Sequence, residues 1–286
     1  MANLKEIRNR ISSVNSTMKI TSAMKMVSAA KLKKAQDAIT AMRPYSEKLT
    51  DLMSNFSNII SSSSISYLSE TRDVKNLLVV SICSNKGLCG AFNSNVIKQS
   101  LSLKNKEEYK GANFSYLTIG KKANDILSKT ENIISNHSDV YDNLVYDEVA
   151  NVSEKIVEEF SLGNFDKVLI VFNSFKNAAN QIVKTEQFLP IENLDETNKT
   201  GDYIFEPSME QIVSELVPKS LKIQLFKSIR DSFAGEHGAR MTAMHKATDN
   251  ATELRDELKL TYNKARQAAI TNEILEIVSG AEALNG

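Results

Sequence analysis

Residues 239–279 read ARMTAMHKATDNATELRDELKLTYNKARQAAITNEILEIVS, a stretch without Gly or Pro that decides the fold of this chain. A helix of this length is about 60 Å long, whereas a compact globule of 286 residues is only about 50 Å across. Its apolar and small side chains step alternately by three and four positions, which places them on the single stripe typical of a coiled-coil seam. The stripe consists of Met244, Ala247, Ala251, Leu254, Leu258, Thr261, Ala265 and Ala268.

The N-terminal residues 1–43 also lack Gly and Pro, and a second helical pattern follows them to about residue 60. A less regular seam runs through Leu4, Ile7, Ile11, Val14, Met18, Thr21, Met24, Val27, Lys31, Ala35, Ala38 and Met42. Half of the C-terminal stripe is Ala, which permits the close approach of a partner helix. We therefore expect residues 1–60 and 208–286 to form a long antiparallel coiled coil, with Ser208 capping the second helix and Pro218 kinking or restarting it.

Between these helices, β-branched apolar runs alternate with amphipathic segments. Strands are predicted at 77–83, 114–120 and 167–175, and an edge strand at 181–190. Helices are predicted near 93–103 and 148–161. This alternation is typical of a small Rossmann-like α/β domain with a largely parallel sheet, spanning about 75–207.

Composition excludes several classes of protein. No apolar run approaches 18 residues, so no membrane span is predicted, and the first twenty residues lack the apolar region of a secretory signal. Cys83 and Cys89 are the only cysteines, too few for a disulfide scaffold, so a reducing compartment is expected. Their spacing of six fits no zinc pattern, and we interpret them as buried thiols.

The formal net charge of zero conceals a partition. Residues 1–43 carry nine basic and two acidic side chains, a net of +7, whereas residues 44–208 carry 16 basic and 22 acidic ones, a net of −6. The basic helix fits either a solvated face or a binding surface, and the two regions indicate separate partners. A nucleic-acid partner is not expected, because the basic residues lack interleaved aromatics and any known reader motif.

The sequence GLCG at 87–90 follows a predicted strand and precedes a predicted helix. Such a turn can hold a phosphate, but it matches neither GxGxxG nor a P-loop, so a plain strand-to-helix turn is favoured. No HExxH, serine elbow or paired catalytic carboxylates occur. We expect no catalytic residue, no metal and no cofactor; a nucleotide-binding α/β enzyme with a helical oligomerisation stalk remains the alternative.

The last turns of the C-terminal helix are apolar on every side, from Ala268 to Leu284. A helix of this kind is normally buried on every side, but one partner helix can cover only one face. The sequence therefore predicts an external protein sleeve around this tip, with tip-to-tip self-association as the other possibility.

Four stretches resemble the gamma subunit of the rotary ATP synthase: KITSAMKMVSAAKLKKAQ (19–36), SNKGLCGAFN (84–93), EHGARMTAMHKATDNA (236–251) and LTYNKARQAAITNEILEIVSGAEAL (260–284). The resemblance implies a central-stalk rotor that carries torque from a proton-driven membrane ring of c subunits to a catalytic ring of alpha and beta subunits. The coiled coil is then a shaft and the α/β domain a foot beside the epsilon subunit. The chain itself performs no bond chemistry.

The resemblance also implies contact residues. Met24 and Lys25 match the place where the family's shaft meets a beta-subunit loop, and Arg266, Gln267 and Thr271 match polar contacts near the tip. Tyr203 and Glu206 are weaker candidates for contact with the c ring. The implied location is peripheral, on the cytoplasmic face of a bacterial inner membrane.

Overall fold

The structure, a computed structural model, describes residues 4–60, 66–178, 180–191, 206 and 208–285. The chain divides into two compact units, Met1–Ser28 with Met241–Gly286, and Ala29–Arg240. Two long helices, α1 (Leu4–Ile60) and α6 (Met209–Asn285), contribute residues to both units. None of the helices in the described ranges is long and apolar enough to cross a membrane.

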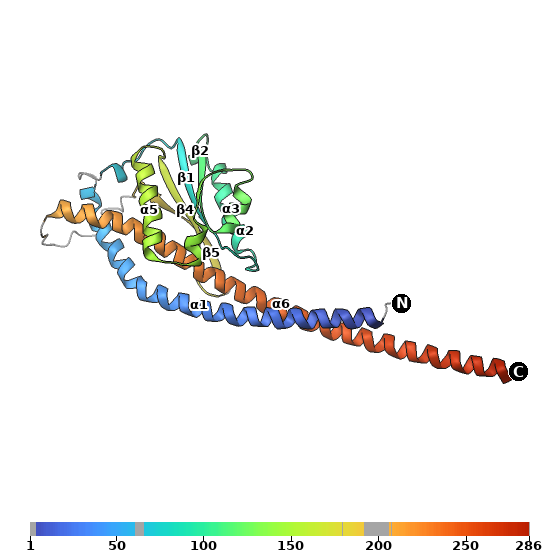
Figure 1. Cartoon of the computed structure of the whole chain (residues 1–286). Helices are drawn as coiled ribbons and strands as arrows, with labels where there is room; N and C mark the ends of the chain where they lie inside the picture. The colour runs from blue at the N-terminus through green and yellow to red at the C-terminus, as the bar shows by residue number, and fades with distance from the viewer. Residues whose placement is uncertain (1–3, 61–65, 179, 192–205, 207, 286) are drawn as a thin grey trace. The chain divides into compact units, whose positions relative to one another are not determined.

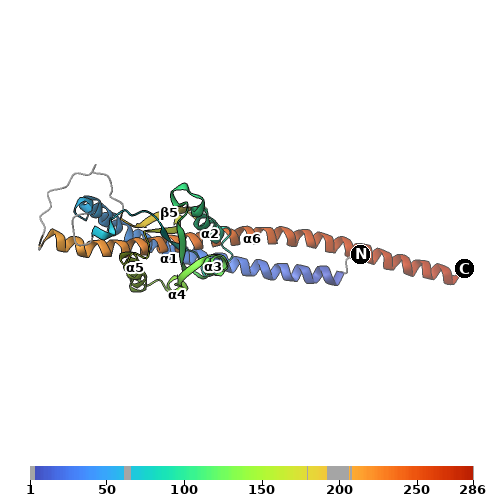
Figure 2. The ribbon, with the colours of Figure 1, turned by 90° about the horizontal axis from the view of Figure 1, so that it is seen from above.

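In the first unit, the start of α1 runs antiparallel to the last part of α6 (Figure 2). The hydroxyls of Thr21 and Thr248 lie 2.8 Å apart, and Arg8 Nη2 donates to the Tyr262 hydroxyl at 2.7 Å. Residue numbers therefore fall on α1 as they rise on α6, which confirms the predicted antiparallel coiled coil.

The seam of α1 differs from the prediction in one place. Val27 is 57% exposed and Lys31 is exposed, whereas Ser28 and Leu32 are buried in their stead. The prediction shifted the stripe because it favoured the more apolar residue, Val27 over Ser28. The helix instead keeps its alternating steps, since these determine which side chains face the partner.

The seam of α6 agrees with the prediction at some positions and differs at others. Met244 and Ala251 are buried, but Leu254 is 39% exposed. Thr248 and Tyr262, each one position beyond a predicted seam residue, are among the α6 residues that contact α1. Polar groups occupy these positions because each finds a partner across the helix pair.

The second unit contains a five-stranded sheet in the order β3-β2-β1-β4-β5 (Figure 1). Strands β1, β2, β3 and β4 run parallel to one another, and β5 pairs antiparallel with β4 at one edge. The four predicted strands are confirmed, but β3 was not predicted. The bounds are β1 Asn76–Ile82, β2 Asn113–Ile119, β3 Asn132–Asn136, β4 Lys167–Phe175 and β5 Gln181–Leu189.

The helices between the strands include both predicted ones, α2 (Phe92–Ser102) and α5 (Tyr146–Ser161). Two short helices, α3 (Lys121–Leu127) and α4 (Ser138–Asp142), were not predicted. Short 3-10 turns lie at Ser66–Leu68, Leu103–Asn105 and Glu107–Tyr109. We call the region from β1 to β5 the sheet domain.

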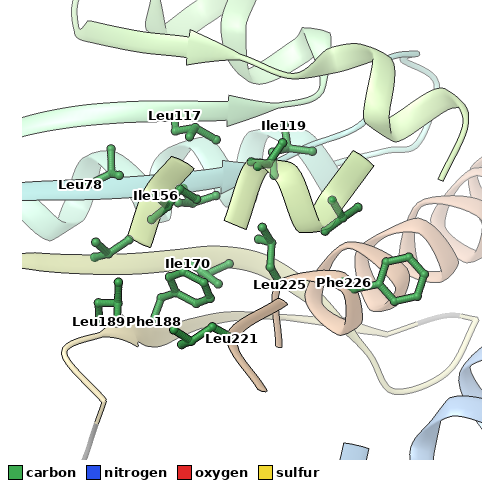
Figure 3. Close-up of a cluster of buried hydrophobic side chains, with 14 of the residues drawn as sticks. Leu78, Leu117, Ile119, Ile156, Ile170, Phe188, Leu189, Leu221, Leu225 and Phe226 are labelled. Atoms are coloured by element: carbon green, nitrogen blue, oxygen red, sulfur yellow. The ribbon is translucent and has the colours of Figure 1, made fainter. Parts of the chain in front are cut away.

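Helices cover both faces of the sheet. On one face, Leu78, Ile119 and Ile170 pack with α5 and with Leu221 and Leu225 of α6 (Figure 3). On the other face, Leu77 and Val79 pack against α2 and α3 through residues that include Val96, Ile97, Ala123 and Leu127. The alternation of β1 side chains between the two clusters explains why this strand reads as a continuous apolar run.

Ser208 caps the start of α6 as predicted, since its Oγ accepts a hydrogen bond from the Gln211 amide at 3.3 Å. The helix then continues through Pro218 without a new start. Similarly, α1 passes through Pro44 as one helix. In both cases tertiary packing outweighs the local cost of a proline inside a helix.

Candidate interaction surfaces

The tip of α6, here defined as Arg266–Ala283, is exposed throughout. Its large apolar side chains include Ile274, Leu275 and Ile277, which are 55%, 57% and 66% exposed. Full burial of a side chain of this kind contributes about 1.5–3 kcal/mol. No described residue of this chain covers the tip. A surface of this kind marks an association site.

Three predicted contact residues lie at the beginning of the tip. Arg266 and Gln267 are both exposed, where the sequence required only that one of them project outward. Thr271 is exposed, and its hydroxyl donates to the Gln267 carbonyl at 2.9 Å. The backbone bond leaves the hydroxyl oxygen free to accept from another molecule.

The other two predicted contact residues lie on α1, where Met24 and Lys25 are half-buried. Lys25 Nζ lies 3.3 Å from Nδ1 of His245, which in turn is 3.4 Å from an Asp249 carboxylate oxygen. Lys25 is therefore held by α6 and is not fully free for a partner.

Prediction from the sequence missed an apolar strip beside Met24. Ile20, Met26 and Val27 are each more than half exposed. Met26 and Val27 line a shallow groove together with Met18, Lys19, Ser22, Ala23 and Thr248. The available signal was that Ile20 and Met26 are large apolar residues off the predicted seam of a surface helix, whereas Val27 was assigned to that seam.

The candidate c-ring residues are only partly placed. Tyr203 lies outside the described residues. Glu206 is exposed and precedes the first residue of α6, Met209.

The turn formed by GLCG connects β1 to α2, as favoured by the sequence. Leu88 and Gly90 have φ of 62° and 61°, which makes the turn tight. The carbonyls of Lys86 and Gly87 accept hydrogen bonds from Arg240 at 3.0–3.2 Å. A loop that presents carbonyls to a cation is unsuited to hold a phosphate, which needs inward-pointing N–H groups.

Both cysteines are buried free thiols, as predicted. Burial is the main cause that raises the pKa of Cys83 and of Cys89 above the ordinary thiol range. The thiolate forms are therefore disfavoured, which makes both residues poor nucleophiles. Among the described residues, no group of three or more His, Cys, Asp or Glu side chains is placed to hold a metal.

The chain is similar to known proteins along its whole length. A family model described as ATP synthase matches residues 3–284. The ATP synthase gamma chain of Flavobacterium psychrophilum is 64% identical over 289 residues, and that of Christiangramia forsetii is 62% identical over 287 residues. Both matches cover 100% of this chain and 100% of the relative.

Two solved structures have a similar fold. A chain of the Euglena gracilis mitochondrial ATP synthase (OSCP/F1/c-ring, rotational state 3) matches with a TM-score of 0.71 at 20% identity, covering 98% of this chain and 94% of that chain. A chain of the Tetrahymena thermophila mitochondrial ATP synthase (central stalk and c ring) matches with a TM-score of 0.58 at 25% identity, covering 80% and 99%. Together, the full-length family match and relatives above 60% identity show that this chain belongs to the ATP synthase gamma chain family.

Proposed function

We propose that this protein is the central-stalk rotor subunit of a proton-translocating ATP synthase. Membership of the gamma chain family makes it a non-catalytic subunit of that complex. The observation that carries the proposal is the exposed apolar tip, because Arg266–Ala283 requires a partner that surrounds it.

The partner of the tip is the ring of alpha and beta subunits. A ring encloses a helix on all sides, whereas tip-to-tip self-association would leave part of the apolar circumference in water. Met24 and Lys25 on the shaft then contact beta subunits, and Arg266, Gln267 and Thr271 contact the ring near the tip. Each beta subunit meets a different face of the shaft as it turns.

The sheet domain is the foot of the rotor. It rests on the c ring with the epsilon subunit beside it, and Tyr203 and Glu206 are the candidate c-ring contacts. Proton flow turns the c ring, and the foot passes this rotation to α6, which is one continuous helix from Met209 to Asn285. The protein is accordingly peripheral, on the cytoplasmic face of a bacterial inner membrane.

The rotor acts on catalysis only through contacts that differ between the open and closed states of a beta subunit. A shaft that touched both states equally would shift neither. The two helices of the pair supply such a difference, since residues 1–43 carry a net charge of +7, whereas residues 241–286 carry five basic and seven acidic side chains, a net of −2.

Reconstitution tests this proposal. The chain is mixed with alpha and beta subunits, and complex formation and ATP hydrolysis are measured. We expect a stable complex, ATPase activity only in the assembly, and no hydrolysis by the chain alone. A form cut after Ala268 is expected to keep a folded sheet domain but to transmit less torque. A chain that binds neither subunit, or a cut form with unchanged coupling, would contradict the proposal.

A further inference from the structure

The carboxyl ends of β1 and β4 form the place where sheets of this class usually bind a ligand. The chain runs from β1 to β2 and β3 on one side and then crosses to β4 on the other, so the strand order reverses at β1. In doubly wound sheets, nucleotides occupy the crevice at this reversal. Here the crevice lies between the turn after β1 and Asn173 near the end of β4.

Side chains of α6 fill this crevice. Glu236, His237 and Arg240 are 4%, 5% and 7% exposed, the only charged or imidazole side chains buried to this degree among the described residues. The α6 backbone also lies close: a Cβ at Gly235 would come within 3.3 Å of the Phe92 ring and of Gln181 Cγ. The usual ligand position is therefore occupied by the protein itself.

Arg240 uses its whole guanidinium group in this position. Nε and Nη2 donate to the Gly87 carbonyl at 3.2 and 3.1 Å, and Nη2 also donates to the Lys86 carbonyl at 3.0 Å. Nη1 pairs with Oε1 of Glu236 at 2.5 Å, one helical turn away. Glu236 thus orients the guanidinium, and the planar fork matches two backbone carbonyls and one carboxylate at once.

These bonds are directional, and they reach the β1–α2 turn, whereas other hydrogen bonds from α6 reach other elements of the sheet domain. Lys222 pairs with Glu154 of α5, and Gln224 Nε2 donates to the Gln187 carbonyl of β5 at 3.1 Å. Leu221, Leu225 and Ile229 contact the sheet through apolar surface, which favours burial but has no preferred direction. Hydrogen bonds to backbone carbonyls fix the angle of α6 about its own axis relative to the β1–α2 turn. Burial of the pair makes these bonds strong, because little water competes for them.

We propose that Arg240, oriented by Glu236, is the torsional joint that makes α6 and the sheet domain turn as one body. The inference rests on the proposed rotor function and assigns a positioning role to a residue on the sheet-domain side of the molecule. In related folds this crevice binds a nucleotide, whereas here it contains the Arg240 side chain, which attaches α6 to the sheet domain.

The test uses the complete ATP synthase in inverted membrane vesicles, with ATP hydrolysis and ATP-driven proton pumping measured on the same preparation. Arg240→Met is expected to keep hydrolysis but to lower the protons pumped per ATP by about fivefold, a change of the size that single residues cause in coupling. Arg240→Lys keeps the charge beside Glu236 but loses the fork, so it is expected to show a smaller loss. Lys227→Met is the matched control, since it removes an exposed cation from the same helix and should pump normally.

Hydrogen exchange gives the structural readout. Amides of residues 84–91 are expected to exchange faster in both Arg240 variants and at the normal rate in the control. Normal pumping per ATP in Arg240→Met, or equal loss in Lys227→Met, would overturn the joint. If Arg240→Met does not assemble, normal pumping in Arg240→Lys overturns it instead. Failure of the rotor proposal is distinct, because the unaltered chain would then be absent from the complex.

Discussion

Arg8 lies over the ring of Tyr262, with its guanidinium carbon 5.7 Å from the ring centroid, and donates from Nη2 to the Tyr262 hydroxyl at 2.7 Å. The hydroxyl is the main cause that raises the pKa of Arg8. One turn further along α6, from Arg266 to Ala283, every residue is exposed. The pair therefore joins α1 to α6 one helical turn before the tip begins.

Loss of this contact should loosen the start of α1. Arg8→Gln removes the cation over the ring and shortens the reach to the hydroxyl, so the first turns of α1 lose this contact to α6. We expect faster hydrogen exchange at residues 4–11, with unchanged exchange in the strands of the sheet domain. Arg10→Gln is the control, because Arg10 is exposed on the same helix. Equal effects of the two substitutions would argue against an anchoring role for Arg8.

Charges placed on the tip should affect assembly without affecting folding. Ile274→Lys combined with Ile277→Lys alters side chains that are more than half exposed, so the free energy of unfolding should change by less than about 0.5 kcal/mol. Binding to the alpha and beta subunits should weaken strongly, because lysines would enter an apolar sleeve. Thermal unfolding and co-purification measure the two effects. The control Glu273→Lys reverses a charge at a position that is already charged, and unweakened binding of the double variant would refute the sleeve.

Gly120 should be irreplaceable in the sheet domain. Its φ is +109°, and a Cβ would lie 2.0 Å from the Cys83 carbonyl oxygen, where β1 and β2 end side by side. Gly120→Ala should therefore lower the free energy of unfolding by about 2–4 kcal/mol through strain and displacement of backbone. Urea unfolding of the isolated chain measures the loss.

Gly87→Ala is the matched control for this substitution. A Cβ at Gly87 meets nothing within 4 Å, and its φ is not in the left-handed region. We expect a change below about 0.5 kcal/mol. Equal losses at the two glycines would show that the close approach at Gly120 is not the cause.

The buried imidazole of His237 should make stability depend on pH. Burial, aided by the nearby charges of Arg240 and Lys31, lowers the pKa of His237 to about 4 from its ordinary 6.5. Between pH 6.5 and 4, His237 is protonated in the unfolded chain but remains neutral in the folded chain. The free energy of unfolding should therefore fall as the pH falls from 6.5 to 4, by up to about 3 kcal/mol.

One variant isolates this contribution. His237→Gln should flatten the dependence in that pH range relative to the unaltered chain. Urea unfolding at several pH values between 4 and 7.5 gives the slopes. A slope for His237→Gln equal to that of the unaltered chain would exclude His237 as the source.

Much of this fold follows from local sequence. The long stretches without Gly or Pro predict α1 and α6, and the β-branched runs predict β1, β2, β4 and β5. The short strand β3 escaped prediction because its residues, Asn132–Asn136, alternate only weakly and are Asn-rich at both ends. It is a strand because β2 offers it an open edge to pair with.

The sequence by itself determined that this protein has an apolar helix tip requiring an outside partner, since periodicity and apolarity are properties of consecutive residues. Only the tertiary structure decided which residues meet at the seam. Ser28 is buried there and Val27 is not, and Tyr262 accepts a hydrogen bond from Arg8. The tertiary structure also decided that Arg240 donates hydrogen bonds to the Lys86 and Gly87 carbonyls, which lie more than 150 positions earlier in the chain. A contact of that kind depends on how distant elements pack, and no local pattern of charge or apolarity specifies it.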